Sequence, residues 1–225
     1  MPQDQATQLR QMMAEARGVE SPSDQTGPAS EPAVASMPGD RATTASTPAT
    51  RVVAVTSGKG GVGKTNVAVN LAAWLATQKK RVVLIDADLG LANADVLCNL
   101  DARVNLSHVV SGRRTPAEAM IEAPGGFRLV PGASGLAHMA AMEPDQQRRL
   151  IELFARIEAD ADLLIIDTGA GIGPSVLGFL LAADDLLVVT TPEPTAMADA
   201  YGLIKSVARQ RPDAPIGLLV NMAES

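Results

Sequence analysis

From Arg51 onward, short apolar runs alternate with longer segments in which apolar residues recur at helical spacing. Such runs suit the buried strands of a parallel sheet, and the segments between them suit the helices that cover it. The predicted strands are residues 52–56, 81–86, 127–131, 163–167, 186–191 and 216–221. The predicted helices are residues 64–78, 145–159, 174–183 and 195–209, with a further helix starting at a capping box of Thr115, Pro116 and Glu118. The pattern therefore predicts an α/β fold: a doubly wound, mostly parallel sheet with helices on both faces.

The first 50 residues differ from the rest of the chain. Residues 18–50 are rich in Ser, Pro, Ala, Thr and Asp and hold almost no large apolar side chains, so burial cannot repay the entropy of ordering them. Ahead of them, Ala6, Leu9, Met13 and Ala16 recur at helical spacing, and Asp4 is placed to start a helix. We predict a short amphipathic helix at residues 1–17, a disordered linker at 18–50 and one domain at 51–225. A closing strand and helix are expected after residue 221, so we also expect this domain to be truncated at its C-terminal end.

A glycine-rich loop lies between the first predicted strand and the first predicted helix. Gly58, Gly63, Lys64 and Thr65 satisfy the pattern G-x-x-x-x-G-K-[ST], which binds nucleotide phosphates. In such a loop backbone N–H groups surround the phosphates, the lysine reaches the β- and γ-phosphate oxygens, and the hydroxyl joins the Mg²⁺ shell. The alternative is a glycine-rich turn with a surface lysine. The residues predicted to contact the nucleotide here are Gly58, Gly60, Gly61, Val62, Gly63, Lys64, Thr65 and Asn66.

Carboxylates follow two of the predicted strands, at the edge of the sheet where folds of this class bind ligands. Asp86 and Asp88 end the second strand and are expected to form a nucleotide-sensing switch; capping of a following turn is the alternative. Four apolar residues lead into Asp167, and Gly169 follows it, as in a Walker B strand. We predict that Asp167 holds Mg²⁺ through water and that the backbone at Gly169 senses the γ-phosphate.

Composition and charge narrow the classes of partner. The net charge of −6 argues against a broad nucleic-acid-binding face, although it leaves room for a small basic patch. No apolar stretch approaches the roughly 20 residues of a membrane span. We expect a soluble, cytoplasmic protein that stays at most transiently at the cell pole or the membrane surface.

The few aromatic, cysteine and histidine residues are interpreted as structural or surface residues. Aromatic residues make up only 2% of the chain, and Trp74 is interpreted as a packing residue. Cys98 is the single cysteine, so it can form no disulfide within the chain and is interpreted as a small core residue. His108 and His138 lack partners at metal-binding spacing and are interpreted as surface or hydrogen-bonded histidines.

Lys59 follows the first glycine of the loop directly, at a position that the general phosphate-loop pattern leaves open. The string from Lys59 to Thr65, K-G-G-V-G-K-T, resembles the deviant Walker A motif of the MinD/ParA family of ATPases. The resemblance implies a MinD-like P-loop NTPase that hydrolyses ATP slowly with Mg²⁺. It also implies an ATP-dependent homodimer in which Lys59 reaches the phosphates of the other subunit; a solvated loop lysine is the alternative.

The same resemblance implies roles for the remaining site residues. Asp88 would orient or activate the attacking water, and Asp86 would support the metal and the phosphate loop. Adenine would sit between Pro192 and Asn221, although ordinary loop chemistry explains both residues equally well. The implied catalytic residues are Lys59, Lys64 and Asp88, and the implied metal-side residues are Thr65, Asp86 and Asp167.

The N-terminal segment resembles one branch of this family, the flagellar number regulators FlhG, FleN and YlxH. Asp4, Gln5 and Ala6, followed by Leu9 and Arg10, match the D-Q-A-x-x-L-R element of that branch. The other matching segments are residues 65–66, 86–95, 167–171, 193–195 and 199–201. The resemblance implies that the N-terminal element stimulates the GTPase FlhF, with Gln5 close to the active site of that partner. A helix that frays in solvent is the alternative.

The branch resemblance also raises two further expectations about partners. A flagellar switch protein or a transcription factor is expected as a second partner. Family members usually continue into a C-terminal amphipathic helix that binds membrane, and no such helix follows Asn221, so this chain does not support membrane binding.

Other functions share this ATPase core. A ParA-like ATPase that partitions or positions DNA or another cargo needs a basic surface, which the acidic charge disfavours. Iron–sulfur carriers use paired cysteines, and tyrosine kinases with this loop carry a tyrosine cluster; the chain holds one cysteine and one tyrosine. A binding module that does not hydrolyse nucleotide would lack the catalytic carboxylate, and Asp88 is present.

Overall fold

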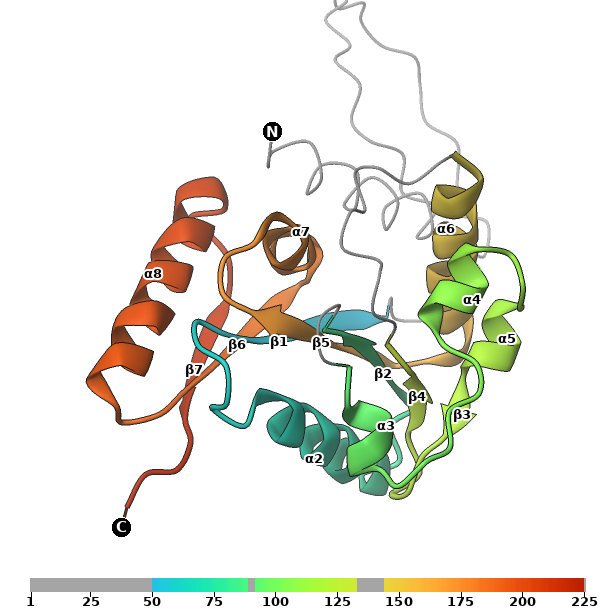
Figure 1. Ribbon diagram of the computed structural model, residues 1–225, viewed down its shortest axis with the longest axis horizontal. Helices are drawn as coiled ribbons and strands as arrows, with labels where there is room; N and C mark the ends of the chain where they lie inside the picture. Colours follow the sequence, from blue (N-terminus) through green and yellow to red (C-terminus); the bar gives the residue numbers. More distant parts are fainter. Residues whose placement is uncertain (1–49, 89–91, 133–143, 225) are drawn as a thin grey trace, which may run out of the picture.

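The computed structural model describes residues 50–88, 92–132 and 144–224, and its strands form one sheet (Figure 1). The strand order is β3-β4-β2-β5-β1-β6-β7. Neighbouring strands pair in parallel except β3 and β4, which are antiparallel. The strands are β1 (Arg51–Ser57), β2 (Val82–Ala87), β3 (Ile121–Glu122), β4 (Arg128–Val130), β5 (Leu163–Ala170), β6 (Asp185–Thr190) and β7 (Ile216–Val220). The predicted mostly parallel sheet is confirmed.

Helices cover both faces of the sheet, as predicted (Figure 1). One face packs against α2 (Lys64–Thr77) and α3 (Ala94–Leu97). The other face packs against α4 (Leu106–Val110), α5 (Pro116–Ala119), α6 (Pro144–Asp160), α7 (Pro174–Ala182) and α8 (Pro194–Gln210). Successive side chains of a central strand pack on opposite faces of the sheet. Val83 and Ile85 belong to one core, and Val82 and Leu84 to the other. This double burial explains why the central strands are continuous apolar runs.

The face that α2 turns to the sheet is made of small residues. Ala68 and Ala72 are fully buried there. Trp74 is 59% exposed, so its interpretation as a packing residue is wrong. The alanines let the helix approach the sheet closely, and a large aromatic side chain is left on the outer side of the helix. Cys98 is buried, as expected for a small core residue.

The shortest elements were missed by the sequence analysis. These are α3, α4 and β3, which contain between two and five residues. The capping box at Thr115 is confirmed, but the helix that it starts, α5, has only four residues. Elements this short complete little more than one turn, or a single pair of residues, and so produce no recognisable period.

Candidate nucleotide-binding site

The glycine-rich loop of residues 58–63 connects β1 to the N-terminus of α2. Gly61 and Gly63 have φ angles of 82° and 85°, in the left-handed region that suits glycine. Gly63 is the N-cap residue of α2, and no side chain caps this helix. Lys64, Thr65 and Asn66 form its first turn. The N–H groups of an uncapped first turn, together with the helix dipole, form a site for an anion such as a phosphate.

Lys64 lies between two of the predicted carboxylates. Its Nζ atom is 2.8 Å from Oδ1 of Asp167, on β5, and 3.9 Å from Oδ2 of Asp88, after β2. The Lys64 side chain is only 8% exposed. The structure thus brings together three predicted site residues from three separate parts of the chain. The two carboxylates balance the charge of this buried lysine.

The two carboxylate oxygens of Asp167 differ in their contacts. Its Oδ2 atom is buried and has no hydrogen-bond partner among the described residues, although its Oδ1 accepts from Lys64. Burial raises the pKa of Asp167, Lys64 and the Thr65 side chain oppose that rise, and the charge of Asp88 adds to it. Carboxylate and hydroxyl oxygens are suitable ligands or water-bridging groups for Mg²⁺. The residues present therefore fit the predicted magnesium ion.

Asp86 holds the chain that follows β2. Its Oδ1 accepts from the N–H of Asp88, and its Oδ2 accepts from the N–H groups of Asn93 and Ala94, at the start of α3. Burial raises the pKa of Asp86 to about 6, against the opposing effect of these hydrogen bonds, and the charge of Asp167 adds to the rise. These contacts are the turn capping that the sequence analysis kept as an alternative. The metal-side role of Asp86 stays a prediction.

Lys59 points to residues at the start of α8 in its own chain. Its Nζ atom is 2.7 Å from Oε2 of Glu193 and 3.0 Å from Oγ1 of Thr195. The contact of Lys59 with Glu193 and Thr195 was not predicted from the sequence. Their signal was weak, since they are 134 and 136 positions from Lys59 along the chain. The role of Lys59 in a second subunit stays a prediction.

One of the two predicted adenine contacts, Asn221, lies beside the phosphate loop. Asn221 donates from Nδ2 to the carbonyl of Val62 over 2.9 Å, and its N–H donates to the carbonyl of Thr190. Pro192 follows β6 and lines an apolar recess of about 430 Å³ between α8 and β7. The end of β7 is therefore tied directly to the loop. The adenine contacts themselves stay predictions.

The segment after Asp167 contacts β1, the strand before the phosphate loop, and lies next to Asp88 of the predicted switch. Gly171, with a φ angle of 92°, donates its N–H to the carbonyl of Ser57 over 2.8 Å. A Cβ at Gly169 would lie 3.6 Å from Oδ1 of Asp88, which is ordinary contact distance. Gly169 is thus placed next to Asp88, where a γ-phosphate sensor is expected.

Several predictions lie outside the described residues. They include the helix at residues 1–17 with Asp4, Gln5, Ala6, Leu9 and Arg10, nearly all of the linker, and His138. His108 is a hydrogen-bonded histidine, as interpreted, because its Nδ1 accepts from the N–H of Asn105 in a capping box. Across residues 50–88, 92–132 and 144–224, no helix is both long and apolar enough to cross a membrane.

Loop, lysine and carboxylates together define a P-loop nucleotide-binding protein, and comparison with known proteins narrows the class. Residues 50–213 match the model of a family described as an AAA domain. The antiactivator FleN of Pseudomonas aeruginosa is 49% identical over 175 residues, which cover 78% of this chain and 62% of FleN. The flagellum site-determining protein YlxH of Helicobacter pylori is 37% identical over 179 residues, covering 77% of this chain and 58% of YlxH.

A solved structure supports the same assignment. The septum site-determining protein MinD of Pyrococcus horikoshii, in complex with Mg-ADP, aligns with a TM-score of 0.63 and 27% identity, covering 76% of this chain and 70% of that one. The chain therefore belongs to the AAA-domain family, in its MinD/ParA branch of P-loop ATPases, with the flagellar number regulators FleN and YlxH among its relatives. It spans 62% and 58% of the lengths of these two relatives.

Proposed function

We propose that this protein is an Mg²⁺-dependent ATPase that dimerises on binding ATP and regulates the number and placement of flagella. The observation that carries the proposal is the contact of Lys64 with Asp167 and Asp88 at the uncapped N-terminus of α2. The similarity to FleN and YlxH supports the flagellar role. The Mg-ADP complex of the related MinD supports the choice of nucleotide and metal.

In the proposed complex the phosphates accept hydrogen bonds from the loop and the first turn of α2. Lys64 exchanges its contact with Asp167 for the phosphate oxygens. Thr65 and Asp167 hold the Mg²⁺ ion, which offsets phosphate charge when it is bound. Asp88 orients the attacking water, and Asp86 keeps the switch segment in place through Asn93 and Ala94. Pro192 and Asn221 lie on either side of adenine.

Light scattering with and without ATP tests whether the protein dimerises on binding ATP. Asp88→Ala should accumulate an ATP-bound dimer, because the attacking water is no longer positioned and the nucleotide persists. Lys64→Ala should lose nucleotide binding and remain monomeric. An Asp88→Ala protein that stays monomeric in saturating ATP would refute the switch.

The finer proposal concerns residues 1–17 as an activating segment for the GTPase FlhF. The sequence supports it through the D-Q-A-x-x-L-R element and the apolar stripe of Ala6, Leu9 and Met13. An isolated helix of this length is marginal in water, so folding on a partner costs about 2–5 kcal/mol and implies modest affinity. Gln5 lies beside the stripe, and a glutamine can orient an attacking water in GTP hydrolysis.

A synthetic peptide of residues 1–17 tests this role. Added to FlhF, it should raise the rate of GTP turnover, and Gln5→Ala in the peptide should abolish the stimulation while binding persists. If peptide and full-length chain are both inert, the activating role is lost and the ATPase proposal stands alone.

A further inference from the structure

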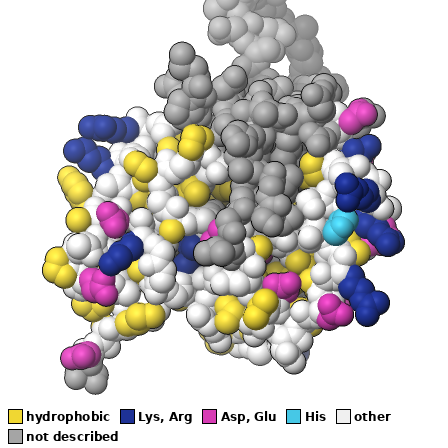
Figure 2. All heavy atoms as spheres, in the orientation of Figure 1, with side chains coloured by type: hydrophobic (Ala, Val, Ile, Leu, Met, Phe, Trp, Pro, Cys, Tyr) yellow, Lys and Arg dark blue, Asp and Glu magenta, His cyan; other side chains and the backbone are white. Residues whose placement is uncertain are grey.

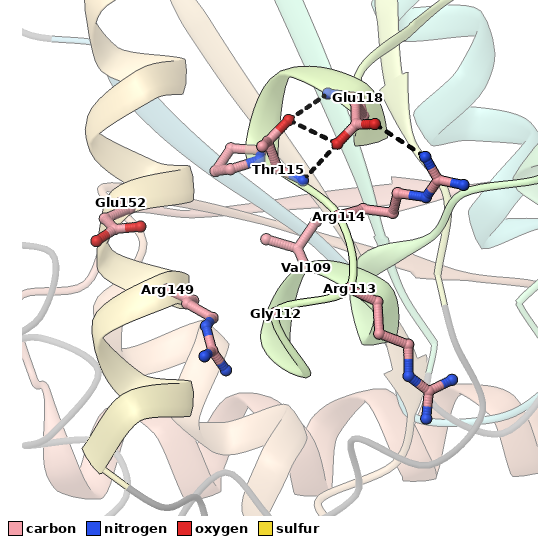
Figure 3. Close-up of a pocket in the computed structure, with 9 residues that line it drawn as sticks. Val109, Gly112, Arg113, Arg114, Thr115, Glu118, Arg149 and Glu152 are labelled. Carbon is pink, nitrogen blue, oxygen red and sulfur yellow. Dashed lines mark hydrogen bonds and ion pairs between the residues drawn. The ribbon is translucent and has the colours of Figure 1, made fainter.

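A polar recess lies between α6 and the turn that joins α4 to α5, and it shares no residue with the nucleotide-binding cluster. Its volume is about 270 Å³. Figure 3 shows Arg149 extending from α6 toward the turn that carries Gly112, and Glu152 also lines the recess from α6. Lys and Arg side chains gather on this side of the molecule, where α4 and α5 lie (Figure 2). The recess is therefore a basic site on a chain whose net charge is −6.

Arg149 is held in place at the recess. Its Nη1 donates to the carbonyl of Val110 over 3.2 Å. Its guanidinium lies directly against Gly112, since a Cβ built there would be 2.5 Å from Cζ of Arg149. A guanidinium carries several further N–H donors in a planar fork that matches a carboxylate or a phosphate. Arg149 thus presents N–H donors on a side chain that is already held in place. Binding a ligand therefore costs less side-chain conformational entropy than it would for a mobile arginine.

The carboxylates of the recess do not neutralise this arginine. Glu118 accepts from the N–H of Thr115 at 2.7 Å, from its Oγ1 at 2.9 Å and from Nη1 of Arg114 at 3.0 Å. These bonds hold the pKa of Glu118 below its ordinary value, so it stays ionised and bound to its own turn. Within the described residues, Arg113, Arg149 and Glu152 form no ion pair. Within the part of the chain that the structure describes, the recess is therefore lined by the ion-paired guanidinium of Arg114 and by Arg113, Arg149 and Glu152, which form no ion pair there.

We propose that this recess binds carboxylate side chains of an acidic segment of a partner protein. A carboxylate would accept paired hydrogen bonds from Arg149, and the exposed Arg113 would add positive charge at the edge of the recess. A single recess of this size suits one or two side chains. It does not suit a nucleic-acid backbone, which needs an extended basic track rather than one recess.

The test uses a capped hexaglutamate peptide as the probe and measures binding to the full chain by calorimetry at low salt. Arg149→Gln should weaken binding roughly tenfold, the loss expected for a charge-assisted pair. Arg156→Gln is the matched control: Arg156 lies on the same helix, and its ion pair with Asp160, at 3.3 Å, lies outside the recess. It removes the same charge and should change affinity less than about twofold.

A second variant leaves the charge unchanged. Gly112→Ala should displace the Arg149 guanidinium and lower the affinity for the peptide as much as Arg149→Gln does. Retained ATP binding checks that the variant is folded. Equal losses in Arg149→Gln and Arg156→Gln would mean diffuse charge attraction and would overturn the site. So would an absence of peptide binding, or inorganic phosphate or oligothymidylate binding tighter than the peptide.

Discussion

At the scale of single residues, buried charge is concentrated around the phosphate loop. Asp86 and Asp167 are 1% and 0% exposed, and Lys64 is 7% exposed. Lys64 and backbone N–H groups compensate these carboxylates, because an uncompensated ionised group in the interior would shift its pKa until it became neutral. Among the described residues, Asp86 accepts hydrogen bonds only from backbone N–H groups, and burial raises its pKa to about 6 against their opposing effect.

Asp86 makes stability depend on pH in a defined direction. Its pKa is about 6 in the folded chain and near the ordinary value of 3.8 in the unfolded chain, so the folded state binds more protons between these values. The stabilisation from Asp86 is present below about pH 4 and is lost as the pH rises through about 6. Urea unfolding should show the free-energy gap between wild type and Asp86→Asn narrowing by about 2 kcal/mol from pH 4 to pH 7.

The control for that measurement is Asp101→Asn, because the Asp101 side chain is 85% exposed. Its gap to wild type should stay constant over the same range. A constant gap for Asp86→Asn as well would contradict the role assigned to burial.

At the scale of elements, the phosphate loop is packed between helices. Gly58 lies against the backbone of α8: a Cβ there would be 2.3 Å from the carbonyl carbon of Asp199 and 2.5 Å from the N atom of Ala200. At Gly60 a Cβ would meet nothing within 4 Å. The first glycine of the motif therefore serves the contact between loop and helix as well as any approach of phosphate.

This difference predicts opposite outcomes for two alanine substitutions in one loop. Gly58→Ala should lower the free energy of unfolding by about 1–3 kcal/mol, because backbone must move to relieve the clash, and it should weaken ATP binding. Gly60→Ala should leave stability unchanged or raise it by less than about 1 kcal/mol. Thermal unfolding and ATP titration measure both; equal stability of the two variants would contradict the packing argument.

At the scale of the whole molecule, Lys59 links the phosphate loop to the start of α8. The contact with Glu193 is half exposed, with side-chain exposures of 41% and 63%, so it is worth little free energy. The lysine is thus free to exchange this partner for another at small cost. This suits the proposed transfer of Lys59 to the phosphates of a second subunit.

The proposed transfer of Lys59 to a second subunit predicts that dimerisation can be lost while ATP binding is kept. Lys59→Ala should bind ATP with near wild-type affinity and fail to dimerise. Glu193→Gln should keep both functions and increase the dimer fraction less than about fivefold, because only an exposed ion pair is lost. Nucleotide titration and light scattering on the same samples decide this; dimers of Lys59→Ala in ATP would exclude the role in the second subunit.

The amino-acid sequence by itself determined the described strands other than β3, the longer helices and the position of the phosphate loop. Buried parallel strands must be continuous apolar runs, and a phosphate loop needs glycines and a lysine at fixed spacing within a few residues, so both are local signals. The sequence also predicted that Lys64 and Asp167 serve one nucleotide site, but their direct contact, between the first turn of α2 and β5, was decided by the tertiary structure.

Only the tertiary structure decided the strand order, the antiparallel β3 and the exposure of Trp74. It alone paired Lys59 with Glu193 and placed Arg149 against Gly112. Each of these contacts joins side chains to parts of the chain that no short-range period connects. Their free energy depends on which surfaces the packed sheet and helices bring within a few ångströms, and a linear pattern does not contain that distance.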